Sequence, residues 1–125
     1  MKDNFQRADA REAHKVIDLA MQCGFMRFLD HYDGMLSRWK AERPVDNREA
    51  YRSFCCAVRE HHQYITRRYN ALSSARYFGT VVGLLIDGIL TDGNLTGFSP
   101  AAKLNLLATV AVLSERTVSS LRGPV

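Results

Sequence analysis

The sequence predicts an all-α protein, a compact bundle of about five helices in a single domain. Apolar residues recur at spacings of three and four along most of the chain, and no segment alternates apolar and polar residues as a half-buried strand does. The length of 125 residues suits one domain, and 46% hydrophobic residues are enough to build a core. We therefore take residues 1–125 as one all-α domain.

The first two predicted helices lie on either side of Gly24. Apolar residues at helical spacing predict the first helix over residues 9–23, and Gly24 stands where a C-terminal cap is expected. A second apolar stripe predicts another helix that ends before Pro44. This stripe comprises Phe25, Phe28, Leu29, Tyr32, Met35, Leu36 and Trp39. Because the two stripes are only moderately out of phase, one helix kinked at Gly24 is the alternative.

The best local signal in the chain precedes the third predicted helix. Residues 46–49 (Asp-Asn-Arg-Glu) have the form of a capping box, with an acceptor side chain at the cap and a glutamate three residues later. From there the helix is predicted to run to Leu72. Its apolar stripe comprises Tyr51, Phe54, Cys55, Val58, His62, Ile65, Tyr69 and Leu72. A histidine on such a stripe is more often a hydrogen-bonded core residue than a metal ligand, so we expect His62 in the core.

The fourth and fifth predicted helices form the most apolar part of the chain. The fourth, over residues 75–90 after a cap at Ser74, has hardly any polar face. The fifth, over residues 100–121, starts with a cap and a proline and is apolar on all sides over residues 104–113. We expect an apolar hairpin that is either the centre of the bundle or the interface of a homodimer. The candidate packing or dimer residues are Ala75, Gly79, Gly83, Ile86, Asp87 and Leu107.

Two features of the fourth predicted helix bear on this choice. Ala75, Gly79 and Gly83 are four residues apart, so they share one stripe that would let another helix approach closely. Asp87 lies within the most apolar segment. If it is buried, its carboxylate needs a partner such as Arg76, and at a dimer interface it could fix the register of the two copies.

Positive charge is concentrated in one segment. The chain has 17 Lys and Arg against 13 Asp and Glu, a net charge of +4, and residues 48–76 alone account for this excess. On a wheel of the third predicted helix, Arg48, Arg52 and Arg59 lie within about 40° of one another, opposite the apolar stripe. This arrangement predicts a straight basic ridge.

Tyr64 is expected on the same polar side, flanked by Arg67 and Arg68. Arginines beside an aromatic ring are the combination that proteins use on phosphates and unstacked bases. The alternative without a binding role is a solvent-exposed helix face in a chain that uses arginine in preference to lysine. The candidate residues for binding nucleic acid or a protein partner are Arg48, Arg52, Arg59, Tyr64, Arg67 and Arg68.

The sequence holds no recognised motif for catalysis or for binding a metal. Cys-x-x-Cys, His-Glu-x-x-His and paired Glu-x-x-His motifs are absent. Residues 92–97 match the first half of a calcium loop, but Lys103 stands where a bidentate carboxylate is needed. We therefore predict no metal, no cofactor and no catalytic residue.

The cysteines and the hydropathy pattern favour a cytoplasmic protein. The three cysteines, Cys23, Cys55 and Cys56, are odd in number and two are adjacent, which does not suit a disulfide framework. The N-terminal residues are too charged for a secretory leader. The most apolar stretch, residues 77–90, is shorter than the roughly 20 residues that span a bilayer, so we expect no membrane segment.

The surplus of apolar helix surface decides the predicted function. We expect a non-enzymatic protein–protein interaction or regulatory module, homodimeric through the fourth and fifth helices, that exposes the first three helices to a protein partner. The alternative is a nucleic-acid-binding regulator that uses the arginine face of the third helix. A second alternative is a small-molecule or metal-binding bundle. Its interior pocket would be lined by Phe25, Phe28, Tyr32, Trp39 and His62.

Overall fold

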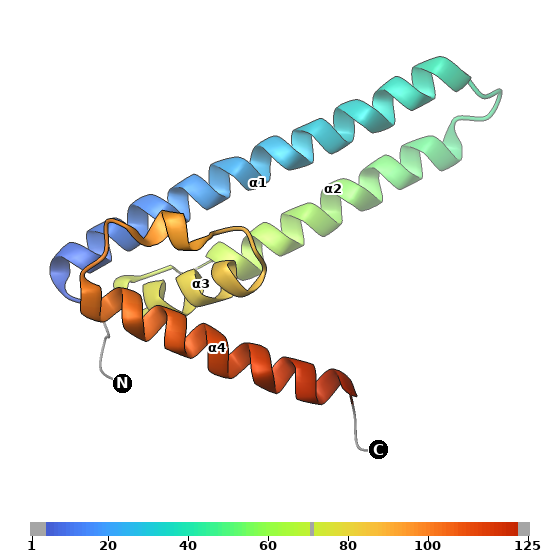
Figure 1. Cartoon of the computed structure of the whole chain (residues 1–125). Coiled ribbons are helices and arrows are strands. Elements are labelled where there is room, and N and C mark those ends of the chain that lie inside the picture. The colour runs from blue at the N-terminus through green and yellow to red at the C-terminus, as the bar shows by residue number, and fades with distance from the viewer. Residues whose placement is uncertain (1–4, 71, 123–125) are drawn as a thin grey trace. The chain divides into compact units, whose positions relative to one another are not determined.

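A computed structural model describes residues 5–70 and 72–122, with side chains for all of these except residues 74 and 116–122. The described residues contain helices and no strand, so the predicted all-α class is confirmed. The elements in chain order are α1 (Arg7–Glu42), α2 (Arg48–Tyr69), α3 (Ser74–Ile86), the short 3₁₀ helix η1 (Asp92–Leu95) and α4 (Pro100–Arg122) (Figure 1). The prediction of about five α-helices is wrong by one.

The missing helix boundary is the one predicted at Gly24, which lies inside the continuous helix α1. A glycine ends a helix when its backbone turns to a positive φ, and Gly24 does not do so. The cost of glycine in a helix interior is roughly 1 kcal/mol, which the apolar contacts on both sides of Gly24 can offset. The cap predicted at this position is therefore wrong, and the alternative is correct in that α1 continues through Gly24 as one helix.

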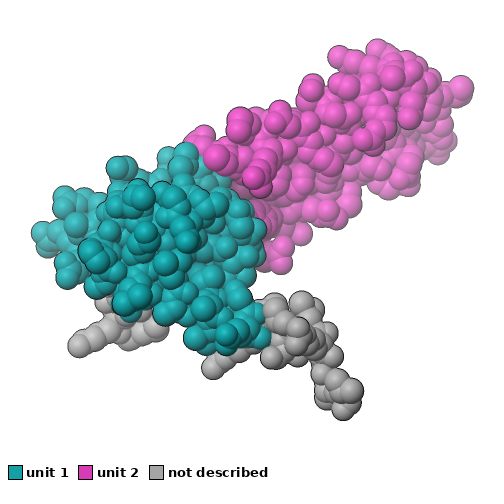
Figure 2. Space-filling view, in the orientation of Figure 1, with its two compact units in different colours: residues 1–20, 72–125 teal, residues 21–71 magenta. Residues whose placement is uncertain are grey.

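The chain forms two compact units, which Figure 2 shows in different colours. We call Met1–Ala20 together with Leu72–Val125 the core unit, and Met21–Ala71 the hairpin unit. Helix α1 contributes its first part to the core unit and its remainder to the hairpin unit. This sharing explains why the sequence shows two apolar stripes on one helix.

The core unit holds all the buried residues of the described chain. They come from the segment before α1, the first part of α1, α3, the η1 loop and α4. The buried apolar side chains are Phe5, Ala13, Val16, Ile17, Ala20, Val81, Val82, Leu84, Leu90, Leu95, Phe98, Ala102 and Leu106. The ring of Phe5 lies 5.3 Å from the rings of both Phe78 and Phe98, so the N-terminal segment packs against α3 and the η1–α4 loop.

One buried carboxylate joins the two chain segments that make up the core unit. Asp9, only 2% exposed, accepts hydrogen bonds from the backbone N–H of Ser99 at 2.8 Å and from the Ser99 hydroxyl at 2.9 Å. It also accepts a bond from the backbone N–H of Gln6 at 3.3 Å, which caps the start of α1. Burial alone would raise the pKa of Asp9, but these bonds outweigh it and hold the pKa below 3.8.

Helices α3 and α4 pack against each other, and their most buried side chains are covered within the core unit. Of the predicted packing residues, Gly83 and Leu107 are half-buried, while Ala75, Gly79, Ile86 and Asp87 are exposed. Gly79 has open space around it within the chain, so no other part of the described chain approaches it closely. A homodimer through these two helices stays a prediction.

Helix α3 ends at Ile86, four residues before the predicted end, because Gly88 takes a left-handed conformation with φ of 75°. The N–H of Gly88 donates to the carbonyl of Leu85 at 3.1 Å, and the N–H of Ile89 donates to that of Leu84 at 3.0 Å. This pair of bonds is the Schellman motif. Asp87 is consequently an exposed C-cap residue, not the buried carboxylate that the sequence made conceivable.

Two glycines of this region should respond in opposite directions to alanine. Gly88→Ala should lower the free energy of unfolding by about 1 kcal/mol, because a residue with a Cβ is strained at positive φ. Gly79→Ala, in a helix interior with open space around it, should raise that free energy by up to about 1 kcal/mol. Urea unfolding followed by circular dichroism measures both. Equal effects of the two substitutions would contradict the Schellman ending.

Candidate functional site

The hairpin unit consists of the second part of α1 and an antiparallel α2, joined by aromatic and polar contacts. The ring of Phe28 stacks on that of His61 with the centroids 4.0 Å apart, and the Tyr32 hydroxyl hydrogen-bonds His61 Nδ1 at 2.7 Å. At the far end, Trp39 Nε1 donates to Asn47 Oδ1 at 2.7 Å. These contacts fix which faces of the two helices meet.

We call the row of residues along this contact the seam. On α1 it comprises Phe28, Tyr32, Met35 and Trp39, and on α2 it comprises Ala50, Phe54, Ala57, His61 and Tyr64, all of them half-buried. Ring contacts of 5.5 Å between Tyr32 and Phe54 and 6.1 Å between Phe28 and Tyr64 lie along it. Desolvation raises the pKa of Tyr32 above 10.0, so its hydroxyl stays protonated across the physiological range.

No described residue of the hairpin unit is buried, although both of its helices carry large apolar side chains. Leu29 is 65% exposed and Leu36 46%, and across the seam Tyr51 is 72% and Val58 39% exposed. Isolated exposed apolar residues are ordinary on a protein surface, but a contiguous set marks an interaction site. Whether these four side chains are contiguous depends on which side of the seam each one lies.

Helical geometry places all four on the same side. Each directly follows a seam residue: Leu29 follows Phe28, Leu36 follows Met35, Tyr51 follows Ala50, and Val58 follows Ala57. One residue turns a helix by about 100°, and in an antiparallel pair the same turn from the seam leads to the same face. We call Leu29, Leu36, Tyr51 and Val58 the apolar face.

The opposite side of the hairpin is polar. The residues that directly precede seam positions point the other way, and they are mostly charged or polar. They are Arg27, His31, Gly34, Arg38, Glu49, Ser53, Cys56, Glu60 and Gln63. Asp33, Lys40 and His62 also directly follow seam residues and are exposed, so polar residues lie beside the apolar face on its side of the hairpin. Large exposed apolar side chains nevertheless gather on that side and not on the other, the pattern of a helix pair that is covered on one side.

An open groove lies at the end of the hairpin where the two helices are joined. Its volume is about 660 Å³. Its apolar lining includes Met35, Leu36, Trp39, Tyr51 and Phe54, and its polar rim includes Arg38, Glu42, Asp46 and Glu49. Leu36 and Tyr51 belong both to this groove and to the apolar face. A partner that covers the face could therefore insert a side chain into the groove.

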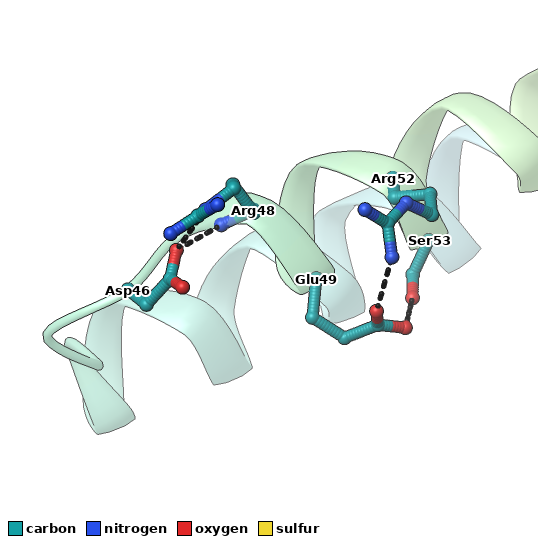
Figure 3. A network of polar contacts seen from close by, with 5 residues as sticks. All are labelled: Asp46, Arg48, Glu49, Arg52 and Ser53. Atoms are coloured by element: carbon teal, nitrogen blue, oxygen red, sulfur yellow. Dashed lines mark hydrogen bonds and ion pairs between the residues drawn. The ribbon is translucent and has the colours of Figure 1, made fainter.

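The predicted basic ridge exists, but carboxylates pair two of its arginines. Arg48, Arg52 and Arg59 are all exposed on α2. Figure 3 shows Asp46 Oδ1 accepting bonds from the backbone N–H of Arg48 at 3.0 Å and from its Nε at 3.2 Å. Arg52 lies 3.1 Å from Glu49, which also accepts a bond from Ser53. Exposed pairs of this kind contribute little to stability, but they offset the positive charge of the ridge.

The same contacts replace the predicted capping box. The N-cap residue of α2 is Asn47, and its side chain makes no cap bond because its oxygen accepts the Trp39 N–H. Glu49 turns along the helix to Arg52 and Ser53 instead of back to the cap. Of the cap predicted at residues 46–49, the Glu49 half is therefore wrong, whereas Asp46 does accept a backbone N–H at the start of α2, that of Arg48.

The other predicted binding residues do not form one cluster with the ridge. Tyr64 is half-buried in the seam against Phe28, not on the polar side, and Arg68 lies 5.5 Å from its ring. Arg67 is exposed. His62, expected in the core, is exposed, while its neighbour His61 occupies the seam. A shift of one residue is a turn of about 100°, which explains both differences.

The residues predicted for an interior pocket are also separated. Phe28 and Tyr32 lie in the seam, Phe25 and His62 are exposed, and only Trp39 lines the groove. Among the described residues, no three His, Cys, Asp or Glu side chains come close enough together to hold a metal ion. Within that same part of the chain, no helix is both long and apolar enough to cross a membrane.

Comparisons with protein-family models, with curated proteins and with solved structures found no match. In the sequence, Leu29, Leu36, Tyr51 and Val58 belong to the same apolar stripes as the seam residues Phe28, Tyr32 and Phe54. The width of each stripe is the signal that could have distinguished exposed apolar residues from those in the seam. Contact between two helices uses only about one residue in every three or four, and these stripes contain more apolar residues than that.

Proposed function

We propose that the chain is a non-enzymatic helical protein–protein interaction module, and that the apolar face of the hairpin unit binds the partner. The observation that supports this is the set of large exposed apolar side chains on one side of a helix pair in which no described residue is buried. Removing such side chains from water stabilises a complex by roughly 25 cal/mol per Å² of apolar area. A cytoplasmic location stays part of this proposal.

Three further features support a protein partner. Two parallel stripes of apolar residues, about one helix diameter apart, suit the packing of other helices across them. The aromatic and aliphatic lining of the groove, with charged residues at its rim, resembles the anchor pocket of a protein interface. The ring stacking and hydrogen bonds of the seam keep the two stripes in fixed relation, so little ordering is needed on binding.

The nucleic-acid alternative has less support in the hairpin unit. Arg48 and Arg52 are paired with carboxylates, and the predicted aromatic partner, Tyr64, is in the seam. A phosphate-binding surface needs several unopposed cations that act together. We therefore keep this alternative as an outcome of the test.

Photo-crosslinking at single positions tests the proposal. A benzophenone side chain placed at Tyr51, on the apolar face, should form protein adducts in cells, and one placed at Gln63, on the polar face, should form few. Equal labelling from both positions, or none from Tyr51, would contradict the proposal. Salt-sensitive binding of duplex DNA that is lost in Arg48→Glu/Arg52→Glu/Arg59→Glu would replace it with the nucleic-acid alternative.

A further inference from the structure

The side of the hairpin that carries the apolar face has a size that suits a specific interface. Helix α2 has 22 residues, so this side is about 33 Å long at about 1.5 Å per residue. Two helices packed 8–10 Å apart are about 20 Å wide, which gives this side an area of roughly 650 Å². A standard stable interface buries about 800 Å² on each partner, so the apolar face together with the polar residues around it approaches the area that one stable contact needs.

A helix pair with one apolar face is half of a four-helix bundle. In such bundles each pair contributes one layer of side chains to a shared core, and neighbouring helices are antiparallel. We propose that the occupant of the apolar face is a second copy of this chain, whose hairpin unit packs face to face on the first through a twofold axis. This inference rests on the proposed function and names the partner.

Charges beside the apolar face, one on each helix, select how the copies pair. On α1, Asp33 directly follows the seam residue Tyr32, so it lies on the side of the apolar face, and it is exposed. On the α2 edge, Arg59 lies two residues after Ala57 and is exposed. In the described part of the chain neither side chain has an ion-pair partner, and the seam separates the two edges within one copy. At the level of Asp33 and Arg59, the α1 edge is thus acidic and the α2 edge basic.

Two face-to-face arrangements are possible, and the charges favour one. If α1 packs on the partner's α1, then α2 packs on the partner's α2, and the two arginine ridges repel each other. If α1 packs on the partner's α2, the acidic edge of each copy meets the basic edge of the other. The second arrangement is electrostatically complementary, because like charges that face each other across an interface are costly.

The twofold axis of this second arrangement runs parallel to the helices and fixes the register. Rotation about this axis does not change the height of a residue along the helices. Each residue therefore lies opposite the partner's copies of the residues that face it across its own seam. Because Tyr32 bonds His61 and contacts Phe54, Asp33 comes level with the partner's Arg59. Leu36 lines the groove with Tyr51, so it comes level with the partner's Tyr51. Twofold symmetry forms each of these contacts twice.

The test is the mass of the full chain by sedimentation equilibrium at micromolar concentration. Wild type should have about twice the monomer mass of 14.1 kDa. Leu29→Lys/Leu36→Lys should be monomeric with an unchanged helical circular-dichroism spectrum. Leu104→Lys, an equally apolar and exposed position of the core unit, is the matched control and should remain dimeric.

Charge exchange tests the pairing without touching the apolar residues. Asp33→Lys and Arg59→Glu should each weaken self-association about tenfold, and the double variant should regain it, because only contacts between copies can restore the pair. A monomeric wild type, a dimer that is lost in Leu104→Lys, or a double variant without recovery would overturn this inference. A monomer that still forms Tyr51-specific adducts with another protein would overturn it while the proposed function stands.

Discussion

Asp9→Ala should lower the free energy of unfolding by about 3 kcal/mol. The substitution removes three hydrogen bonds to a buried carboxylate, and bonds to charged groups contribute about 1.5–3 kcal/mol each before partial compensation. It also leaves the N–H and hydroxyl of Ser99 without their acceptor in a region with little access to water. Asp9→Asn keeps one carbonyl acceptor and should cost about half as much.

The contribution of Asp9 should also depend on pH. Its pKa in the folded chain lies below 3.8, so the unfolded chain binds more protons over the interval between the two pKa values. Stability therefore rises with pH across that interval. The contribution is fully present above the unfolded pKa and is lost as the pH falls through the folded pKa. The difference between wild type and Asp9→Asn should accordingly be constant near neutrality and shrink in acid.

Urea unfolding at several pH values measures this difference, and hydrogen exchange of the Ser99 amide gives a local reading. The exchange should accelerate in Asp9→Ala, because that amide donates to Asp9 in the wild type. Asp18→Ala is the matched control: Asp18 is exposed on the same helix, and its loss should change stability by less than about 0.5 kcal/mol. Equal effects of the two substitutions would mean that Asp9 does not hold the α4 start to α1.

The sequence predicted the helical class because that class depends on local periodicity, and periodicity is visible in any window of the chain. The boundaries were less predictable, because they depend on the φ angle of single residues. Gly24 and Gly88 look alike in sequence, yet Gly24 is helical and Gly88 has φ of 75°. The difference arises because the part of α1 after Gly24 packs against α2 through the seam, whereas the chain turns after Ile86 so that Leu90 is buried.

The binding surface was harder to predict for a different reason. Residues such as Tyr51 and Val58 belong to the apolar stripe of α2 whether they face a core or a partner, so periodicity alone does not distinguish the two. The contact between Asp9 and Ser99 joins positions 90 residues apart, and no local pattern indicates it. The basic ridge was predictable because exposed residues at a fixed spacing keep their positions on the wheel.

Leu84→Ala should be among the most destabilising apolar truncations in the core unit, at about 3–4 kcal/mol. Leu84 has no exposed surface and lies on α3 among the residues that pack against α4. Truncation loses the transfer energy of the removed atoms and leaves a cavity, and buried Leu→Ala changes cost about 2.7–5 kcal/mol when the surroundings cannot collapse. Leu84→Met conserves volume and should cost less than about 1.5 kcal/mol.

The stability cost of truncating two other leucines should differ from that of Leu84→Ala in its dependence on protein concentration. Leu104→Ala, 70% exposed on α4, should change stability by less than about 0.5 kcal/mol at any protein concentration. Leu29→Ala should behave the same way in dilute solution, but its cost should grow with protein concentration, because a second copy that covers Leu29 stabilises the folded chain by mass action. Leu84→Ala should cost the same at every concentration, since its contacts lie within one chain. Urea unfolding of the three variants at two protein concentrations therefore separates the core that the chain completes alone from the surface that a partner completes.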